Sequence, residues 1–213
     1  MEAKLTIDQT KQNYDGILKV LAKEVNAAMK AVSASVIAQI KPIVGEAILQ
    51  SYEMRSLLGG SLQGHLGIRP GDNDNAVFQI TNAVMNAVYV EWTPLTTSKP
   101  GKLNIFIQPN NFANLLSLRA GENDAVHKTD GAYTMEWLDW LLRMGDTPIV
   151  KGYEYQAGIT GRSGQGIMKK KAGSVWRVPP EFAGTIDDNF VTRALDDEQV
   201  ESQIAKILKK TIQ

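Results

Sequence analysis

The chain has 213 residues, of which 43% are hydrophobic and 22% are charged, and 23 acidic and 23 basic residues give a formal net charge of zero. Typical domains hold about 150 residues, so this length predicts a single structural domain over residues 1–213. The absence of cysteine excludes disulfides, thiolate nucleophiles and thiolate zinc sites. The neutral charge argues against a dedicated DNA-binding domain. No run of about 18 apolar residues or signal-peptide core is present, so we expect neither a membrane protein nor an exported one.

An amphipathic helix is predicted near the start of the sequence. From Tyr14 to Ile40 the apolar residues recur at spacings of three and four, which places them on one stripe of a helix. The predicted helical segment covers residues 11–58. Pro42 lacks the N–H that would continue the backbone hydrogen bonds, so we expect a break or a bend there. After a stop at Gly59–Gly60, Ser61 is expected to cap a second short helix.

The middle of the sequence alternates helix and strand signals. Residues 70–75 have the composition of a turn, and residues 77–87 predict a helix. Residues 89–94 and 103–108 predict a β-hairpin around the turn TTSKPGK. A short helix at Phe112–Leu118 and a polar surface loop at Gly121–Gly131 follow. Residues Tyr133–Met144 predict a helix, with Thr134 as a possible cap, that is apolar on nearly all sides and therefore buried in the core or against a partner.

The last third predicts one more strand pair and two helices. Strands at residues 148–155 and 173–178 flank a Gly-rich extended loop over residues 156–172, which ends in Lys169–Lys171. Helices are predicted at residues 187–195 and 197–211. The expected fold is therefore α+β, with a small antiparallel β-sheet flanked by a long N-terminal helix, a central apolar helix and C-terminal helices.

The motifs of catalysis and cofactor binding are each incomplete. The chain has only two histidines, His65 and His127, which is too few for a histidine metal cage. The stretch Gly161–Gln165 (GRSGQ) misses the last glycine of a nucleophile elbow and the first glycine of a phosphate loop. Asp72–Asn75 starts like a calcium loop but lacks its later ligands. We expect no catalytic residues, no cofactor and no metal, and hence no enzyme.

Several stretches, in this order, resemble the tail-completion or neck proteins of contractile-tailed bacteriophages. They span roughly residues 15–195, and their order carries the resemblance, since no single motif is specific. After the amphipathic helix they are EMRSLLGG (53–60), IQP (107–109), FANLL (112–116), EWLDWLL (136–142), GRSG (161–164), WRVPPEFAGT (176–185) and DNFVTRA (188–194).

The resemblance implies a virion structural protein that packs side by side into a ring, commonly of six copies. Such a ring ends the tail tube (a tail terminator) or joins it to the head–tail connector. The implied partners are other copies, tail tube, sheath and connector, with DNA at most passing through the ring and with no membrane. We expect contacts through the Tyr14–Ile40 stripe, the 133–144 helix and the Gly158–Lys171 segment. The candidate interface residues are Trp137, Trp140, Arg162, Ser163, Lys169, Lys170, Lys171, Trp176, Phe182 and Arg193.

Three alternatives stay open. The chain could be another connector or tail-tube-associated virion protein. It could be a DNA-binding accessory protein that uses Lys169–Lys171 with Arg162 and Arg177. It could also be a tail-associated wall hydrolase, for which Glu136 or Glu181 would be the catalytic carboxylate.

Overall fold

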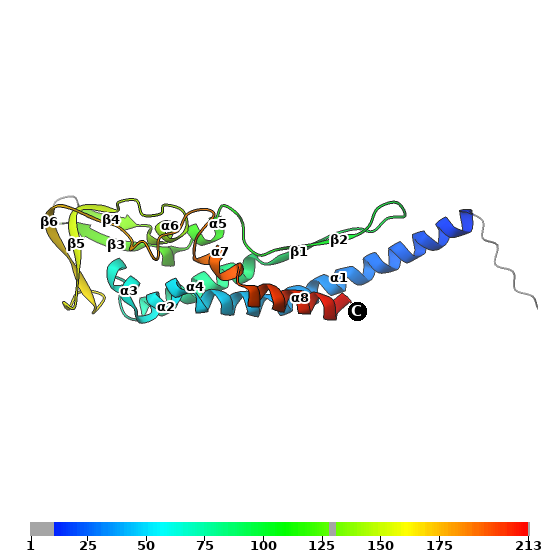
Figure 1. Ribbon diagram of the computed structural model, residues 1–213, viewed down its shortest axis with the longest axis horizontal. Coiled ribbons are helices and arrows are strands. Elements are labelled where there is room, and N and C mark those ends of the chain that lie inside the picture. The colour runs from blue at the N-terminus through cyan, green and yellow to red at the C-terminus, as the bar shows by residue number, and fades with distance from the viewer. Residues whose placement is uncertain (1–10, 128–130, 213) are drawn as a thin grey trace, which may run out of the picture.

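The computed structural model describes residues 11–127 and 131–212, which form an elongated α+β molecule (Figure 1). Its first half contains α1 (Lys11–Gln50), α2 (Tyr52–Gly59), α3 (Ser61–Leu66), α4 (Asp72–Ala87), β1 (Tyr89–Thr93) and β2 (Lys102–Phe106). Its second half contains α5 (Ala113–Leu116), the 3-10 helix η1 (Arg119–Gly121), β3 (Asn123–His127), β4 (Gly131–Met135), α6 (Trp137–Leu142), β5 (Val150–Ala157), β6 (Gly166–Trp176), α7 (Phe190–Leu195) and α8 (Glu198–Ile212). The predicted α+β class and long N-terminal helix are confirmed.

Helix α1 runs for 40 residues and continues through Pro42. The predicted break of the helix at this proline is therefore wrong. The reason lies in the packing on both sides of the proline. Val36, Ile40, Val44 and Ile48 of α1 are all fully buried in the core, which holds the two parts of the helix in line. Pro42 itself lies on the exposed side of the helix.

The short helices after α1 use other caps than the sequence indicated. Ser51 caps α2, since its side chain accepts a hydrogen bond from the Met54 N–H. Ser61 is the first residue of α3 and makes no capping hydrogen bond, so that prediction is wrong. The hydroxyl of Ser56 instead accepts from the Leu62 N–H at 3.0 Å. Helix α4 begins at Asp72, inside the predicted turn, because acidic residues favour the first helical turn.

The strands form three separate two-stranded antiparallel sheets. The predicted hairpin of β1 and β2 is confirmed, with Val90 opposite Ile105. The predicted surface loop at 121–131 is wrong where it is described, since β3 pairs with β4 there. The predicted helix at 133–144 shrinks to α6, because residues 133–135 belong to β4 and Glu136 is not helical (φ −80°, ψ 67°). Residues 128–130 of the predicted loop lie outside the described residues.

The third sheet replaces most of the predicted extended loop over residues 156–172. Strand β6 begins at Gly166, its residues 166–170 pair with β5, and only residues 158–165 connect the two strands. The register shifts between Lys151 and Tyr153, and Gly152 and Gly173 both have φ of 78° at this irregularity. Glycine suits this left-handed conformation, which explains how two glycines can stand inside strands.

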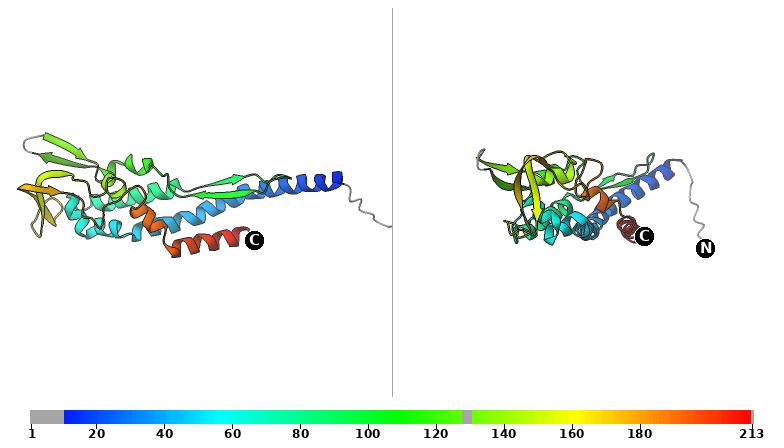
Figure 2. Two further views of the ribbon diagram at one scale, coloured as in Figure 1. Left: turned by 45° about the horizontal axis from the view of Figure 1, so that its top comes forward. Right: turned by 60° about the vertical axis from the view of Figure 1, so that its left-hand side comes forward.

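The core lies where α1, α4 and α6 meet the segments before and inside α7. Its largest fully buried side chains include Trp137, Phe182 and Phe190. Asn189 begins α7 with a capping box, since its side chain accepts from the N–H groups of Val191 and Thr192. Helix α8 packs along α1, which lets the two long helices run side by side (Figure 2).

Helix α1 is also long and apolar enough, over Tyr14–Gln50, to span a membrane by length and composition alone. A core helix of a folded domain passes the same test. The C-terminal half of α1 places its apolar stripe in the core, as described above, which accounts for much of its apolar character.

Candidate assembly surfaces

The N-terminal part of α1 extends beyond the body of the molecule (Figure 1). We call residues 14–31 of this helix the arm. Four large apolar side chains of the arm are exposed, namely Tyr14 at 65%, Ile17 at 57%, Val20 at 63% and Leu21 at 55%. Positions three and four residues apart lie on one face of a helix, so these side chains form a continuous apolar stripe. Large exposed apolar patches mark interaction sites in soluble domains.

The β1–β2 hairpin fixes the arm from one side. Asn26 of the arm accepts hydrogen bonds from the Trp92 indole N–H at 3.0 Å and the Leu95 N–H at 2.9 Å, and its own amide donates to the Leu95 carbonyl at 2.9 Å. Gly101 lets the opposite strand approach, since a Cβ there would meet the Trp92 ring at 2.2 Å. The hairpin therefore holds the arm in one direction while its apolar stripe stays open.

Strand β6 carries a second exposed surface. All six residues from Met168 to Gly173 are exposed, although a strand on a core normally alternates buried and exposed positions. We call these six residues the finger. They include Lys169, Lys170 and Lys171, and Lys171 forms an ion pair with Glu154 of β5. The hydrogen bond from Lys171 holds the pKa of Glu154 below its usual value. Both faces of the finger are thus open to a partner.

The β5–β6 hairpin is fixed against α3 at its connecting segment and at the end of β6. The Arg162 guanidinium donates to the Gly67 carbonyl at 2.8 Å, and Gln165 donates to Gln63 at 2.9 Å. The ring of His65 lies 3.9 Å from that of Tyr155. The Trp176 indole donates to His65 Nδ1 at 3.4 Å.

Burial lowers the pKa of His65, and the nearby charge of Glu181 opposes this only in part. His65 therefore serves as a packing residue between α3 and the β5–β6 hairpin.

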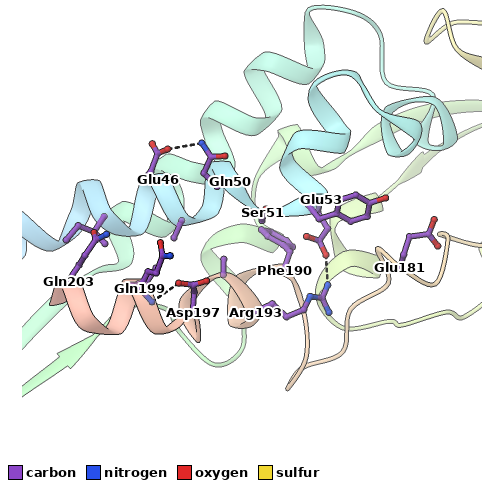
Figure 3. A pocket seen from close by; sticks show the side chains of 15 residues that line it. Glu46, Gln50, Ser51, Glu53, Glu181, Phe190, Arg193, Asp197, Gln199 and Gln203 are labelled. Carbon is purple, nitrogen blue, oxygen red and sulfur yellow. Dashed lines mark hydrogen bonds and ion pairs between the residues drawn. The ribbon is translucent and has the colours of Figure 1, made fainter. Parts of the chain in front are cut away.

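A groove of about 480 Å³ lies between α1, α2, α7 and α8 (Figure 3). Its apolar wall contains Ile43, Ala47, Phe190, Ala194 and Val200. Its polar side chains include four carboxylates and one guanidinium, from Glu46, Glu53, Glu181, Asp197 and Arg193. The groove therefore combines an apolar wall with an acidic rim.

Within the groove one carboxylate is neutralised and the others are open. Glu53 is nearly buried and pairs with Arg193, which also donates to Asp188 at 2.7 Å. Burial alone would lower the pKa of Arg193, but its hydrogen bonds to Glu53 and Asp188 outweigh burial and raise it. Glu46 accepts only from Gln50, and Asp197 accepts from the Gln199 N–H at 2.8 Å. Within the described residues, no cation forms an ion pair with Glu46, Glu181 or Asp197.

The structure divides the predicted interface residues into three groups. Trp137, Trp176, Phe182 and Ser163 are buried within the chain, so they support the fold and do not reach a partner from this conformation. They were chosen because large aromatic side chains serve cores and interfaces equally, and composition does not separate the two roles. Trp140 is partly buried against the core.

The remaining predicted interface residues are exposed and lie on two surfaces. Arg162 and Lys169–Lys171 belong to the β5–β6 hairpin, and Arg193 lines the groove. The sequence interpretation missed Glu46 and Asp197 as groove residues. No local signal could have found the groove, because its walls come from segments about 150 residues apart.

The side chains considered for chemistry lie apart from one another. Glu136 precedes α6, Glu181 lies on the rim of the groove, and both are exposed. Within residues 11–127 and 131–212, no group of three or more histidine and carboxylate side chains is placed to hold a metal ion. Among the described residues, these surfaces do not bring a set of reacting side chains together. Their exposed apolar and charged side chains are suited to contacts with a partner.

No family model matches the chain, and no curated protein and no solved structure matches it either. The proposed function therefore rests on the residues and surfaces of this chain.

Proposed function

We propose that the chain is a virion structural subunit of a tailed bacteriophage, a neck or tail-completion protein that forms a ring of copies at the head–tail junction. The observation that carries the proposal is the arm. Four large apolar side chains stay exposed on a helix that extends away from the body. Burying such a side chain gains about 1.5–3 kcal/mol, so the stripe is a strong site for association.

The arrangement of the surfaces favours a ring over a symmetric dimer. The arm points away from one end of the molecule and β6, which carries the finger, lies at the other end (Figure 1). Helices α7 and α8, which line the groove, lie between them. Surfaces that differ from each other support head-to-tail contacts, and such contacts close into rings when the rotation between neighbours allows it. At 1.5 Å per residue, a 40-residue helix is about 60 Å long and can reach across a neighbouring subunit.

The stretches that resemble neck proteins have clear structural roles in this chain. Phe182 is fully buried and its ring stacks on Tyr52 at 4.9 Å. Gly184 has no room for a side chain, since a Cβ would lie 1.9 Å from the Leu141 carbonyl oxygen. Asn189 caps α7. Residues that determine a fold are those a structural family has to keep, which supports the resemblance as one of architecture.

The full chain, purified, tests this proposal by sedimentation and negative-stain microscopy. We expect a closed ring whose mass is a whole multiple of 23.4 kDa, and binding of that ring to the ends of isolated tail tubes. A protein that stays monomeric at every concentration and binds no virion component would contradict the proposal.

A second candidate function follows from the exposed lysines. The finger, with Arg162 and Arg177, could contact phosphates as a DNA-binding accessory protein would. Binding of this kind weakens steeply with added salt, so a DNA titration at two salt concentrations measures it. Arg177 is paired with Asp146 and the whole chain is neutral, which makes this candidate the weaker one.

A further inference from the structure

The finger and the groove carry opposite charge. The strands β5 and β6 contain four lysines and one glutamate, a formal charge of +3, and the side chains that line the groove contain four carboxylates and one arginine, a formal charge of −3. The chain as a whole is neutral, so these are two local excesses that offset each other.

The two surfaces are separated within one molecule. Figures 1 and 2 place β5 and β6 at one end, beyond α3, while α7 and α8 lie nearer the middle. Among the described residues, no ion pair joins a lysine of the finger to a carboxylate of the groove. Lys169 and Lys170 therefore have no acidic partner in the groove of their own chain.

The exposure and the apolar side chains of the two surfaces also suit docking. Because both faces of the finger are exposed, it can enter a groove without first leaving a packed position. It begins with Met168, an exposed apolar side chain, and the groove has an apolar wall between its acidic residues. An apolar contact surrounded by paired charges is the usual anatomy of a protein interface.

We propose that the finger of one copy docks in the groove of the next copy, with Lys169 and Lys170 facing Glu46 and Glu181. The contact joins two different surfaces and is therefore head-to-tail, which is the geometry that a ring requires. The inference rests on the proposed function, because it names the surfaces through which neighbouring subunits of the assembly meet.

Charge decides between a second copy and DNA as the occupant. A DNA-binding face gains its affinity by neutralising many phosphates, and here three lysines stand alone on a neutral chain that also carries an acidic groove. A second copy supplies an acidic groove at the same concentration as the finger itself.

Charge reversal with rescue tests the proposal on the full chain. The finger variant is Lys169→Glu/Lys170→Glu, and the groove variant is Glu46→Lys/Glu181→Lys. Lys171 and Asp197 are left unchanged, because the first pairs with Glu154 and the second accepts the Gln199 N–H. A combined variant carries all four changes, and Lys99→Glu/Lys102→Glu, on exposed positions of the β1–β2 hairpin, is the matched control.

Sedimentation then measures the association of each variant at low salt. We expect the finger and groove variants each to raise the apparent dissociation constant at least about tenfold, because like charges face each other across the contact. The combined variant should recover most of this loss, which also shows that both changed surfaces fold. The control should associate like the unchanged chain, and added salt should weaken every association that depends on these charges.

The experiment distinguishes failure of the docking contact from failure of the proposed function. If the unchanged chain stays monomeric, both this inference and the proposed function are overturned. If it assembles and the finger and groove variants assemble equally well, the docking contact is wrong while the proposed function stands. If the finger variant loses affinity for a DNA duplex but still assembles, the lysines serve nucleic acid and the docking contact is again overturned.

Discussion

Arg193 of α7 forms an ion pair with Glu53 of α2, although 140 residues separate them in the sequence. The Glu53 side chain is only 4% exposed, so the ion pair compensates a nearly buried carboxylate. The pair joins two walls of the groove and thereby fixes the distance between them (Figure 3).

Replacing Arg193 with Met should lower the free energy of unfolding by about 2 kcal/mol. Loss of one partner of a buried pair costs about 3–5 kcal/mol, and the 39% exposure of Arg193 reduces this, since solvent screens the charge. Urea unfolding followed by circular dichroism measures the change. The double variant Glu53→Met/Arg193→Met should be more stable than Arg193→Met alone, and a lower stability of the double variant would show that Glu53 does not need its partner.

Replacing Asn26 with Ala should release the β1–β2 hairpin from the arm. Three hydrogen bonds are lost at one position, and the cost should be about 1–3 kcal/mol of local stability. Hydrogen exchange of the amides in residues 89–106 should become faster, while exchange in α6 should stay unchanged. Equal protection of the hairpin in both proteins would mean that Asn26 does not hold it.

Two glycine-to-alanine variants should change stability in opposite directions. Gly184→Ala should destabilise the chain by about 3 kcal/mol, because the new Cβ meets the Leu141 carbonyl oxygen and backbone cannot move away cheaply. Gly16→Ala should not destabilise it, since no atom lies within 4 Å and alanine favours the helix by up to about 1 kcal/mol. Thermal unfolding compares them, and a tolerated Gly184→Ala would contradict the close packing.

His65 should make the chain less stable in mild acid. Burial lowers its folded-state pKa below the unfolded value of about 6.5. The unfolded state therefore binds more protons as the pH falls through 6.5, and stability that is complete above this pH is lost below it, by at most about 1.4 kcal/mol per pH unit.

Urea unfolding at pH 7.5 and pH 5.5 measures the loss attributed to His65. The difference between the two pH values should be smaller in His65→Gln than in the unchanged chain. Equal differences would show that His65 does not contribute to the pH dependence.

Local signals in the sequence predicted those elements whose formation depends on local chemistry. The β1–β2 hairpin was predicted because TTSKPGK is a turn between two alternating strands, and α4 and α8 were predicted from their periodicity and terminal charges. The β3–β4 hairpin was missed because residues 121–131 are polar and lack a strand pattern. Pro42 was expected to break or bend α1, and core packing on both sides of it keeps the helix continuous.

The surfaces were harder to predict than the elements. The apolar stripe of α1 was predicted as a contact surface, but the sequence does not tell that its C-terminal part is buried and its N-terminal part is exposed. Lys169–Lys171 were placed in a loop, since three lysines in a row give no strand signal. In the structure all three belong to β6, where Lys169 and Lys170 pair with β5. Glu46 and Glu181 line one groove only through tertiary packing, from opposite ends of it (Figure 3).

The exposed stripe of the arm gives the most direct test of assembly. The variant Ile17→Glu/Leu21→Glu places two charges on the stripe, and Ala34→Glu/Ala38→Glu places two charges at the same spacing on exposed positions of α1 outside the arm. The measurement is the mass of each protein by sedimentation velocity. We predict that the unchanged chain and the alanine-site control form the same ring, and that the stripe variant remains a folded monomer of 23.4 kDa. A stripe variant that assembles like the unchanged chain would contradict the account.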